Sequence, residues 1–489
     1  MKKYVIALDQ GTTGSRAVAF DHDGKCVGSV NKEFTQFFPS PGWVEHDPYD
    51  ILQSQMGALF ELIKKLAVKP EQIAAIGITN QRETVVVWDK MTGKPVYNAI
   101  VWQCRRTAGI CEQLKADGYA DLIKSETGLV LDAYFSGTKI KWILENVKEV
   151  KNKSLLCGTI DTWLIYNLTK EKSHVTDMSN ASRTMLFNIN TLEWDKQLLD
   201  ILGIKKEMLP KVVPSSCVVG HMELEGISIP IAGIAGDQQA ALFGQACFEP
   251  GEVKNTYGTG CFILMNTADK PVFSDKGLIT TIAWNLNNKT YYALEGSIFN
   301  SGSAVQWLRD QLGLIKTAAE TEDMAFAVED TDDVYFVPAF TGLGTPHWDM
   351  YARGVLVGIT RGTNKNHIAR AVLESMAYQT VDVIDCMQQC SDVALKCLKV
   401  DGGASANNFL MQFQADMLNC DVVRPVMQET TSLGAAFLAG LAVGFWKDVE
   451  ELKGIIKQDR IFVPKDFFDR EYRKKRWHEA IKRSKNWAR

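Results

Sequence analysis

Short runs of hydrophobic and polar residues follow one another along the chain in an order that predicts strands, turns and helices. Residues 4–8 and 16–20 are apolar runs on either side of a Gly- and Thr-rich turn at residues 9–15, which predicts a β-hairpin. Residues 51–66 carry apolar positions at helical spacing, and residues 72–78 predict another strand. Alternating helices and strands of this kind are typical of the α/β class.

The second half of the chain repeats the opening of the first. A strand at residues 229–234 leads through Asp237 into a predicted helix at 238–248. Residues 252–265 then read as strand, Gly-Thr-Gly turn, strand, which matches the order at the N-terminus. We interpret this as a duplicated α/β unit with its boundary at the Pro-Gly turn near residue 250.

Three later segments complete the prediction. Residues 84–88 and 99–102 predict a second β-hairpin, and residues 398–418 predict a strand, a Gly-Gly turn and a helix. Residues 430–446 are uncharged and rich in Gly, Ala and Ser. Because this stretch is slightly short for a membrane span, we expect a tightly packed buried helix.

Composition narrows the class of protein. The chain has 489 residues, 46% hydrophobic and 23% charged, with a net charge of −4, so we expect a folded protein without a general attraction to nucleic acid. Residues 470–489 nevertheless hold nine basic and two acidic residues, a net charge of +7. Trp477, Ala480, Ile481 and Ser484 share one face there, which favours a surface helix docked on the body over a membrane-surface or partner helix.

Location is predicted from what the sequence lacks. The apolar stretch after Lys3 is broken by Asp9, so no signal peptide is readable, and we expect a cytoplasmic protein without a stable membrane anchor. The 11 cysteines form no CxxC pair and no zinc-like spacing, which favours reduced thiols.

The turn at residues 9–15 has the groups that a phosphate chain requires. Backbone amides and the Thr12 and Thr13 hydroxyls suit phosphate oxygens, and the Asp9 carboxylate suits Mg²⁺. An ordinary hairpin explains the turn equally well. Because the chain has no Walker or Rossmann phosphate loop opening a helix, any nucleotide must be held by another device. Residues 258–260 and 402–407 are each a weak signal of phosphate or nucleotide binding when considered alone. Their occurrence in this order after the turn at residues 9–15 is what indicates a nucleotide site.

Three other positions combine polar chemistry with a strand end. Asp237 is a candidate general base, although Asp is also a common helix N-cap. Arg82 and Glu83 can hold a polyol between a donor and an acceptor, or form a surface salt bridge of little value. Trp102 can offer an apolar wall to C–H groups, but core packing is the usual role of a lone Trp.

These residues lie within longer stretches that resemble the glycerol kinases of the sugar and polyol kinase family, over essentially the whole chain. The most specific are NQRET (80–84) with VWQCRRT (101–107), and others are ALDQGTTGSRAV (7–18), IAGDQQAALFGQ (234–245), NTYGTGCFILMNT (255–267) and VDGGASANNFLMQFQADML (400–418).

The resemblance implies an α/β fold with two large lobes of actin-like (ribonuclease H-like) architecture and an active site in the cleft between them. It implies an N-terminal kinase domain at 1–248 and a C-terminal nucleotide-binding domain at 249–489, with the basic tail at 447–489. Relatives of this kind form homodimers or homotetramers, and we expect the same here.

The resemblance also implies roles for individual residues. Asp237 would be the general base for ATP-dependent phosphorylation of glycerol to sn-glycerol 3-phosphate by in-line transfer, and Asp9 would lie near Mg²⁺, through water. Glycerol would lie against Arg82, Glu83, Trp102, Tyr134, Asp237, Gln238 and Phe262. ATP would contact Thr12, Thr13, Gly14, Arg16, Thr259, Gly302, Gln306, Gly403 and Asn407.

Two alternatives stay open at this point. One is a related kinase for another small polyol or a ketose, against which the Arg82, Glu83, Trp102 and Phe262 set argues by predicting a small pocket. The other is a non-catalytic, ATP-driven actin-like module. Such a module needs a filament surface or a peptide-binding domain, and only about forty residues follow residue 446.

Overall fold

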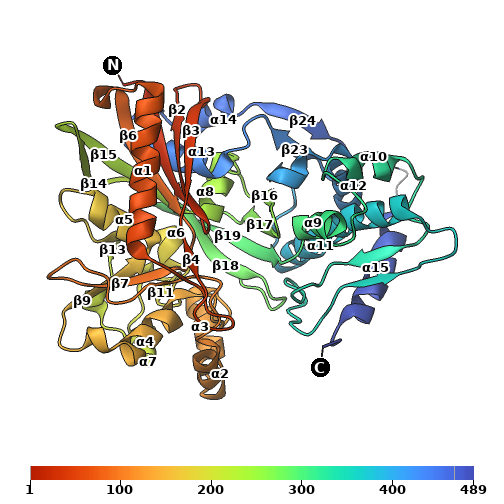
Figure 1. The fold of residues 1–489 in the computed structure, drawn as a ribbon, viewed down its shortest axis with the longest axis horizontal. Helices are drawn as coiled ribbons and strands as arrows, with labels where there is room; N and C mark the ends of the chain where they lie inside the picture. The colour runs from red at the N-terminus through yellow and green to blue at the C-terminus, as the bar shows by residue number, and fades with distance from the viewer. Residues whose placement is uncertain (1, 467–468, 489) are drawn as a thin grey trace.

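Two large sheets form the framework of the computed structural model, which describes residues 2–466 and 469–488 (Figure 1). The first sheet has the strand order β14-β15-β6-β1-β2-β3. Its strands are β1 (Tyr4–Gln10), β2 (Gly14–Phe20), β3 (Cys26–Glu33), β6 (Ile73–Asn80), β14 (Ser216–Leu224) and β15 (Ile227–Gly236).

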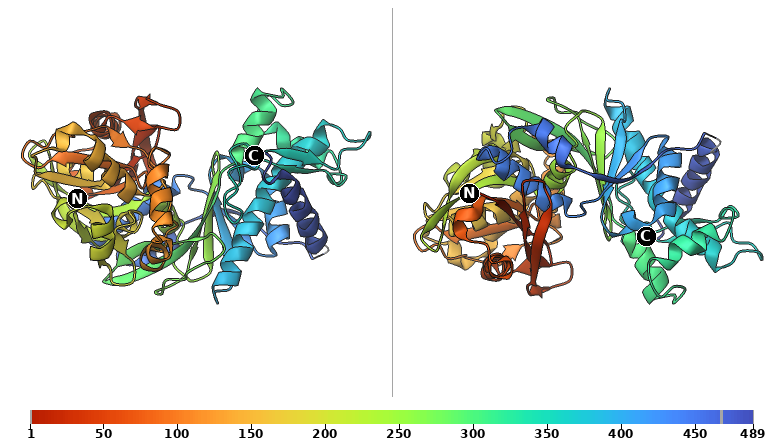
Figure 2. Two further views of the ribbon diagram at one scale, coloured as in Figure 1. Left: turned by 90° about the horizontal axis from the view of Figure 1, so that it is seen from below. Right: turned by 90° about the horizontal axis from the view of Figure 1, so that it is seen from above.

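The second sheet comes from the C-terminal half and has the order β18-β19-β17-β16-β22-β23-β24. Its strands are β16 (Glu252–Tyr257), β17 (Cys261–Asn266), β18 (Ile279–Leu286), β19 (Lys289–Ile298), β22 (Cys397–Asp401), β23 (Val422–Pro425) and β24 (Gln458–Phe462). The two further views in Figure 2 show two bodies side by side, one built around each sheet.

Smaller strands and the helices surround this framework. A third sheet, β4-β5-β8-β7-β9, is made of β4 (Gln36–Phe37), β5 (Glu45–His46), β7 (Val85–Asp89), β8 (Ala99–Ile100) and β9 (Leu155–Thr159). Two-stranded pairs are β10 (Val175–Asp177) with β13 (Lys211–Val213), β11 (Phe187–Asn188) with β12 (Glu193–Trp194), and β20 (Tyr335–Val337) with β21 (Val355–Val357). The helices are α1 (Pro48–Leu66), α2 (Ala108–Ala116), α3 (Ala120–Thr127), α4 (Ser136–Asn146), α5 (Ile160–Leu168), α6 (Met178–Ala181), α7 (Lys196–Leu202), α8 (Asp237–Gly244), α9 (Gly302–Asp310), α10 (Glu320–Phe326), α11 (Lys365–Cys390), α12 (Asn408–Leu418), α13 (Thr430–Ala442), α14 (Val449–Ile455) and α15 (Arg470–Ser484).

The two large sheets open in the same way. Strand β1 is antiparallel to β2 and parallel to β6, and β16 is antiparallel to β17 and parallel to β22. The hairpin turns follow Gln10 and Tyr257. The strand–turn–strand pattern predicted for both halves is therefore confirmed, and both turns lie at the ends of central strands.

Some predicted elements are shorter in the structure. The strand expected at 99–102 ends at Ile100, and the helix expected within 430–446 ends at Ala442. The helix expected at 238–248 is α8, which ends at Gly244. Ala246 has a φ of 49°, a left-handed conformation that cannot continue a right-handed helix. The chain therefore turns before it enters the second sheet, a change of direction that the apolar run from Ala240 to Phe248 does not reveal.

Helix α13 confirms the expectation of a tightly packed buried helix. It follows the second sheet in the chain but lies against α8 and the first sheet, among β6, β15 and β1 (Figure 1). A Cβ atom on Gly434 would lie 1.8 Å from the Ala240 carbonyl oxygen, and one on Gly77 would lie 2.2 Å from the Ala435 oxygen. Glycine and alanine are needed here because the backbones nearly touch.

The basic C-terminal segment forms α15, docked by one face as predicted. Trp477, Ala480, Ile481 and Ser484 are buried, and Trp477 stacks on Tyr378 of α11 with ring centroids 5.3 Å apart. The last residue of the predicted tail, Arg489, lies outside the described residues. Among residues 2–466 and 469–488, no helix has both the length and the apolar character to cross a membrane.

Basic residues of α15 pair with acidic residues of the body. Arg473 and Lys474 lie 3.3 Å from Glu374 and 2.8 Å from Asp385 of α11, and Arg476 pairs with Asp333. The positive charge of the tail is thus partly compensated inside the same molecule.

The close packing of α13 leads to a stability prediction. Replacing Gly434 by Ala should cost about 1–3 kcal/mol, because the new methyl group must displace backbone atoms of α8. The midpoint of thermal unfolding, measured at one scan rate, should fall by several degrees.

Gly454→Ala is the matched control, since Gly454 lies in α14 and no atom lies within 4 Å of its Cβ position. Its midpoint should stay level or rise, because Ala is a better helix former than Gly. Equal midpoints for the two variants would contradict the packing argument.

Candidate active site

Arg82 and Glu83 follow the C-terminal end of β6, a central strand of the first sheet. Both side chains are buried, with 3% and 1% of their surface exposed. The loop is held to the neighbouring hairpin because the Gln81 amide donates to the Gln10 carbonyl at 2.7 Å. The surface salt-bridge interpretation is therefore wrong.

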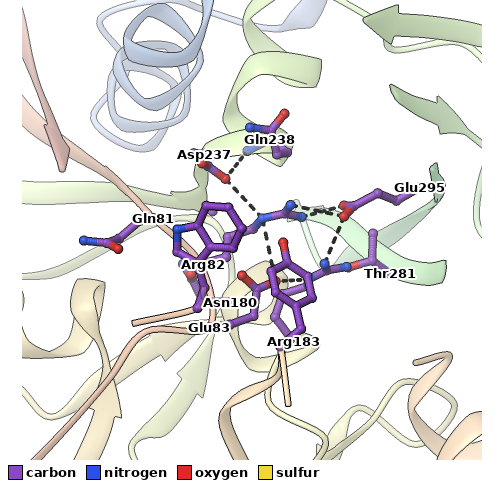
Figure 3. Close-up of polar contacts among 12 residues, drawn as sticks. Gln81, Arg82, Glu83, Asn180, Arg183, Asp237, Gln238, Thr281 and Glu295 are labelled. Atoms are coloured by element: carbon purple, nitrogen blue, oxygen red, sulfur yellow. Dashed lines mark hydrogen bonds and ion pairs between the residues drawn. The ribbon is translucent and has the colours of Figure 1, made fainter. Parts of the chain in front are cut away.

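The Arg82 side chain reaches acidic groups from two other elements (Figure 3). Its Nε lies 3.1 Å from Asp237 Oδ1, and its two terminal nitrogens lie 2.5 and 3.1 Å from the Glu295 oxygens. The stem passes Gly236, where a Cβ atom would come within 2.7 Å of it. Glycine before Asp237 thus makes room for the arginine.

Arg183 completes a network that sequence reasoning missed. It follows α6, and its Nε lies 2.6 Å from Glu83 Oε1 while Nη2 lies 2.9 Å from Glu295 Oε1. The result is a chain of alternating charges, Glu83, Arg183, Glu295, Arg82 and Asp237, which we call the ion network (Figure 3). Glu295 and Arg183 are 112 residues apart, and no local pattern in the sequence signals their pairing.

Burial and pairing set the charge state of this network. Burial opposes ionisation of Glu295, yet Arg183 and Arg82 hold the pKa of that carboxyl down to about 2. Burial raises the pKa of Glu83, and the two guanidinium groups oppose that rise. The network persists because each buried charge has a partner of opposite sign.

Asp237 is the exposed end of the network. Its side chain is 33% accessible, and Oδ1 accepts from the Gln238 amide at 2.7 Å as well as from Arg82. The N-cap interpretation is wrong, because Gly236 is the cap residue and Asp237 is the first residue of α8. A partly accessible, oriented carboxylate at the end of β15 is suited to accept a proton.

The hairpin between β1 and β2 is held by residues from distant segments. Asp9 Oδ2 accepts from Ser432 Oγ of α13 at 2.9 Å, and burial raises the pKa of Asp9 to about 6. Arg16 pairs with Glu429, just before α13. A Cβ on Gly14 would lie 2.9 Å from the Lys32 carbonyl oxygen, so glycine there lets β3 approach.

Trp102 connects this hairpin to the polyol residues. Its indole Nε1 donates to Thr12 Oγ1 at 3.0 Å, and its ring meets Tyr134 edge to face with centroids 5.6 Å apart. Its side chain is only partly buried, so simple core packing does not describe it. Phe262 lies on β17 opposite Ser297, also partly buried, and has no ring contact with Trp102.

The nucleotide residues of the second half gather around the turn after β16. The Gly302 amide at the start of α9 donates to the Gly258 carbonyl at 3.0 Å, next to Thr259. Gly402, beside Gly403, has a φ of 84° and lies against Tyr257, where a Cβ would be 2.5 Å from a carbonyl oxygen. Of the three turns predicted from the sequence, those at residues 258–260 and 402–407 are therefore close backbone neighbours.

Two further predicted nucleotide residues have different surroundings. Gln306 is an exposed residue of α9, one turn after Gly302. Asn407 caps α12 by accepting from the Leu410 amide at 2.9 Å, and it donates to Thr321 of α10 at 3.2 Å. Asn407 therefore begins α12 and links it to α10.

The two sets of predicted nucleotide residues lie on different sheets. Within residues 2–466 and 469–488, no hydrogen bond or ion pair joins Thr12, Thr13, Gly14 or Arg16 to the set around Thr259. In the described part of the chain, no three His, Cys, Asp or Glu side chains lie together in a group that could hold a metal ion. Asp9 offers one carboxylate, which suits a cation held mainly by phosphates and water.

The N-terminal domain model of the FGGY family of carbohydrate kinases matches residues 4–244, and its C-terminal domain model matches residues 253–443. Glycerol kinase 2 of Thermotoga maritima is 62% identical over 99% of this chain and 99% of its own length. The crystal structure of Plasmodium falciparum glycerol kinase with ADP covers 98% of both chains, with 40% identity and a TM-score of 0.92.

A ligand-bound xylulose kinase from Lactobacillus acidophilus matches less closely in sequence, with 27% identity, a TM-score of 0.89, and 98% of this chain and 97% of that chain covered. These matches agree with the predicted two-part α/β fold. This chain therefore belongs to the FGGY family of carbohydrate kinases, and within that family it groups with the glycerol kinases.

Proposed function

We propose that this protein transfers the γ-phosphoryl group of ATP to a terminal hydroxyl of glycerol and forms sn-glycerol 3-phosphate. The observation that carries the proposal is the ion network, which presents Arg82, Glu83 and Asp237 together in a chain so similar to glycerol kinases. The Arg82 guanidinium can donate hydrogen bonds to a hydroxyl group of a small polyol, and the Glu83 carboxylate can accept one from a second hydroxyl group. The Asp237 carboxylate can accept from the third hydroxyl group.

Asp237 acts as the general base in this proposal. It accepts the proton of the attacking hydroxyl while that oxygen forms a bond to the γ-phosphorus and the bond to the ADP oxygen breaks in line. Arg82 at 3.1 Å fixes the orientation of the carboxylate. Trp102 and Tyr134, which meet edge to face, provide the apolar side of the polyol site.

The phosphate chain of ATP is assigned to the two Gly-Thr turns, with Thr12, Thr13, Gly14 and Arg16 on one side and Thr259, Gly302, Gln306, Gly403 and Asn407 on the other. These sets come from different halves of the chain and no hydrogen bond joins them in the described residues, so we expect the two bodies to approach one another during the reaction. Such closure excludes water, which would otherwise compete with glycerol. Mg²⁺ would be held near Asp9 through water, where it would offset the charge of the phosphates.

Two finer points belong to the same proposal. All eleven cysteines are free thiols, which fits a reducing compartment, and we assign the protein to the cytoplasm.

One short segment exposes three large apolar side chains, those of Trp348, Met350 and Tyr351. Such exposure fits self-association as a homodimer or homotetramer.

The substrate assignment has two competitors. A ketose such as xylulose is one, because the chain also resembles a xylulose kinase in fold. The other is an ATP-driven actin-like module without a small-molecule substrate.

A substrate panel tests the proposed function. Glycerol, dihydroxyacetone, xylulose and gluconate are compared by ADP formation with MgATP, and the position of the phosphate in the product is identified by NMR. We expect glycerol to have the highest kcat/KM and to stimulate ATP turnover strongly. A higher kcat/KM for xylulose or gluconate than for glycerol would show that glycerol is not the preferred substrate. ATP turnover that none of the four compounds changes would favour the ATP-driven actin-like module.

Asp237→Asn tests the base. Because the amide cannot accept the proton, kcat should fall by about 10²–10⁴-fold while glycerol binding stays measurable by calorimetry. Asp392→Asn is the control, since Asp392 is exposed and its side chain makes no hydrogen bond or ion pair with the described residues, and this variant should keep normal turnover. Near-normal turnover in Asp237→Asn would rule out the base assignment.

A further inference from the structure

Lys254 is a fully buried lysine on β16, the strand that leads into the turn at residues 258–260. Its ammonium donates to Gln238 Oε1 and, at 3.1 Å, to Thr256 Oγ1. No carboxylate in the described residues lies within ion-pair distance of it. Buried lysines are rare unless they are paired, so a buried cation that meets only neutral acceptors requires an explanation.

The surroundings of Lys254 are predominantly acidic at somewhat longer range. The charged groups that act on it electrostatically are Asp401 at the end of β22, Asp237 of α8, Glu295 of β19 and Arg82 after β6. Its cross-strand neighbour Lys399 is compensated by Glu252 at 3.0 Å. Without Lys254, the side chains of Asp401, Asp237, Glu295 and Arg82 carry a net charge of −2, and an incoming phosphate chain would add more negative charge.

The bond from Lys254 to Gln238 connects both parts of the candidate site, and the bond to Thr256 lies within β16. Gln238 follows Asp237 at the start of α8, and Thr256 lies two residues before Gly258 on the other sheet. A single ammonium therefore joins the neighbour of the base to the strand that carries the phosphate turn. An apolar side chain of similar length, such as methionine, would fill the space but would make neither bond.

We propose that Lys254 is a positioning residue for phosphoryl transfer, whose charge offsets the carboxylates around Asp237 and whose hydrogen bonds hold Gln238 and the strand before the phosphate turn. This inference rests on the proposed kinase function. No covalent step passes through Lys254. Its effect is electrostatic, because a cation in a site of low dielectric lowers the cost of bringing an anionic phosphate chain beside an anionic base.

The proposal has a pH consequence. Burial lowers the pKa of Lys254 to about 8, and the nearby carboxylates oppose that shift. The ammonium is present below that pH and is lost as the pH rises through it. The value of kcat/KM for ATP at saturating glycerol, which reports the enzyme before ATP binds, should therefore fall as the pH rises past 8.

The test compares wild type with Lys254→Met, with Lys399→Met as the matched control. Lys399 is the cross-strand neighbour of Lys254 on β22 and is also largely buried, but it bonds to the Ala246 carbonyl and Glu252 rather than to the predicted substrate residues. Wild-type glycerol phosphorylation is measured first. Its absence would refute the proposed function, whereas the Lys254 inference is judged only on the differences between variants.

We expect Lys254→Met to lower kcat by about 10²-fold, to raise the KM for glycerol and to lack the fall of kcat/KM above pH 8. Lys399→Met should keep kcat within about threefold of wild type, whatever its thermal midpoint. A folded Lys254→Met protein with a kcat within threefold of wild type, or with the same fall above pH 8, would overturn the inference. Should Lys254→Met fail to fold, a wild-type kcat/KM that stays level from pH 7 to 9.5 would overturn it, and a fall past pH 8 would support it.

Discussion

The geometry of the candidate site depends on one buried ion network. Removing one partner from such a network leaves an uncompensated buried charge, at a typical cost of about 3–5 kcal/mol, so each member constrains the others. Arg82 and Glu83 come from the end of β6, Asp237 from the start of α8 and Glu295 from β19. Since Glu295 belongs to the second sheet, the network also joins the two bodies of the molecule. Arg82, Glu83 and Asp237, which the sequence predicts to contact the polyol, therefore constrain one another's positions.

Helix α13 imposes a second constraint, which acts on the hairpin between β1 and β2, where the sequence predicts phosphate contacts. Its glycines and alanines bring it to backbone contact with α8 and the first sheet, which leaves little freedom in its position. Ser432 is thereby placed against Asp9, and Glu429, just before the helix, against Arg16. A segment that follows the second sheet thus orients the hairpin of the first, although the two sets of predicted nucleotide residues do not touch.

Local patterns predicted much of this arrangement, and non-local pairing accounts for what they missed. Strands, the two Gly-Thr turns and the buried helix that begins at Thr430 follow from apolar periodicity and glycine, which act over a few residues. Asp237 and Arg82 could be proposed as candidates because they follow strand ends. The pairing of Arg183 and Glu295 with them could not be predicted, because it depends on partners far away in the sequence. The burial of Arg82 was also hidden, since a charged residue after a strand usually predicts solvent.

The uneven charge of the chain has the same origin in non-local pairing. From the sequence, the basic segment at 470–489 favours a helix docked on the body, and its charge alone leaves an anionic membrane or partner open. In the structure, Arg473, Lys474 and Arg476 meet Glu374, Asp385 and Asp333 of the body. Partly exposed pairs contribute little energy singly, so the buried stripe around Trp477 supplies most of the attraction and the charges fix how α15 lies on α11. Part of the excess of acid in the body and of base in the tail therefore meets at one intramolecular interface.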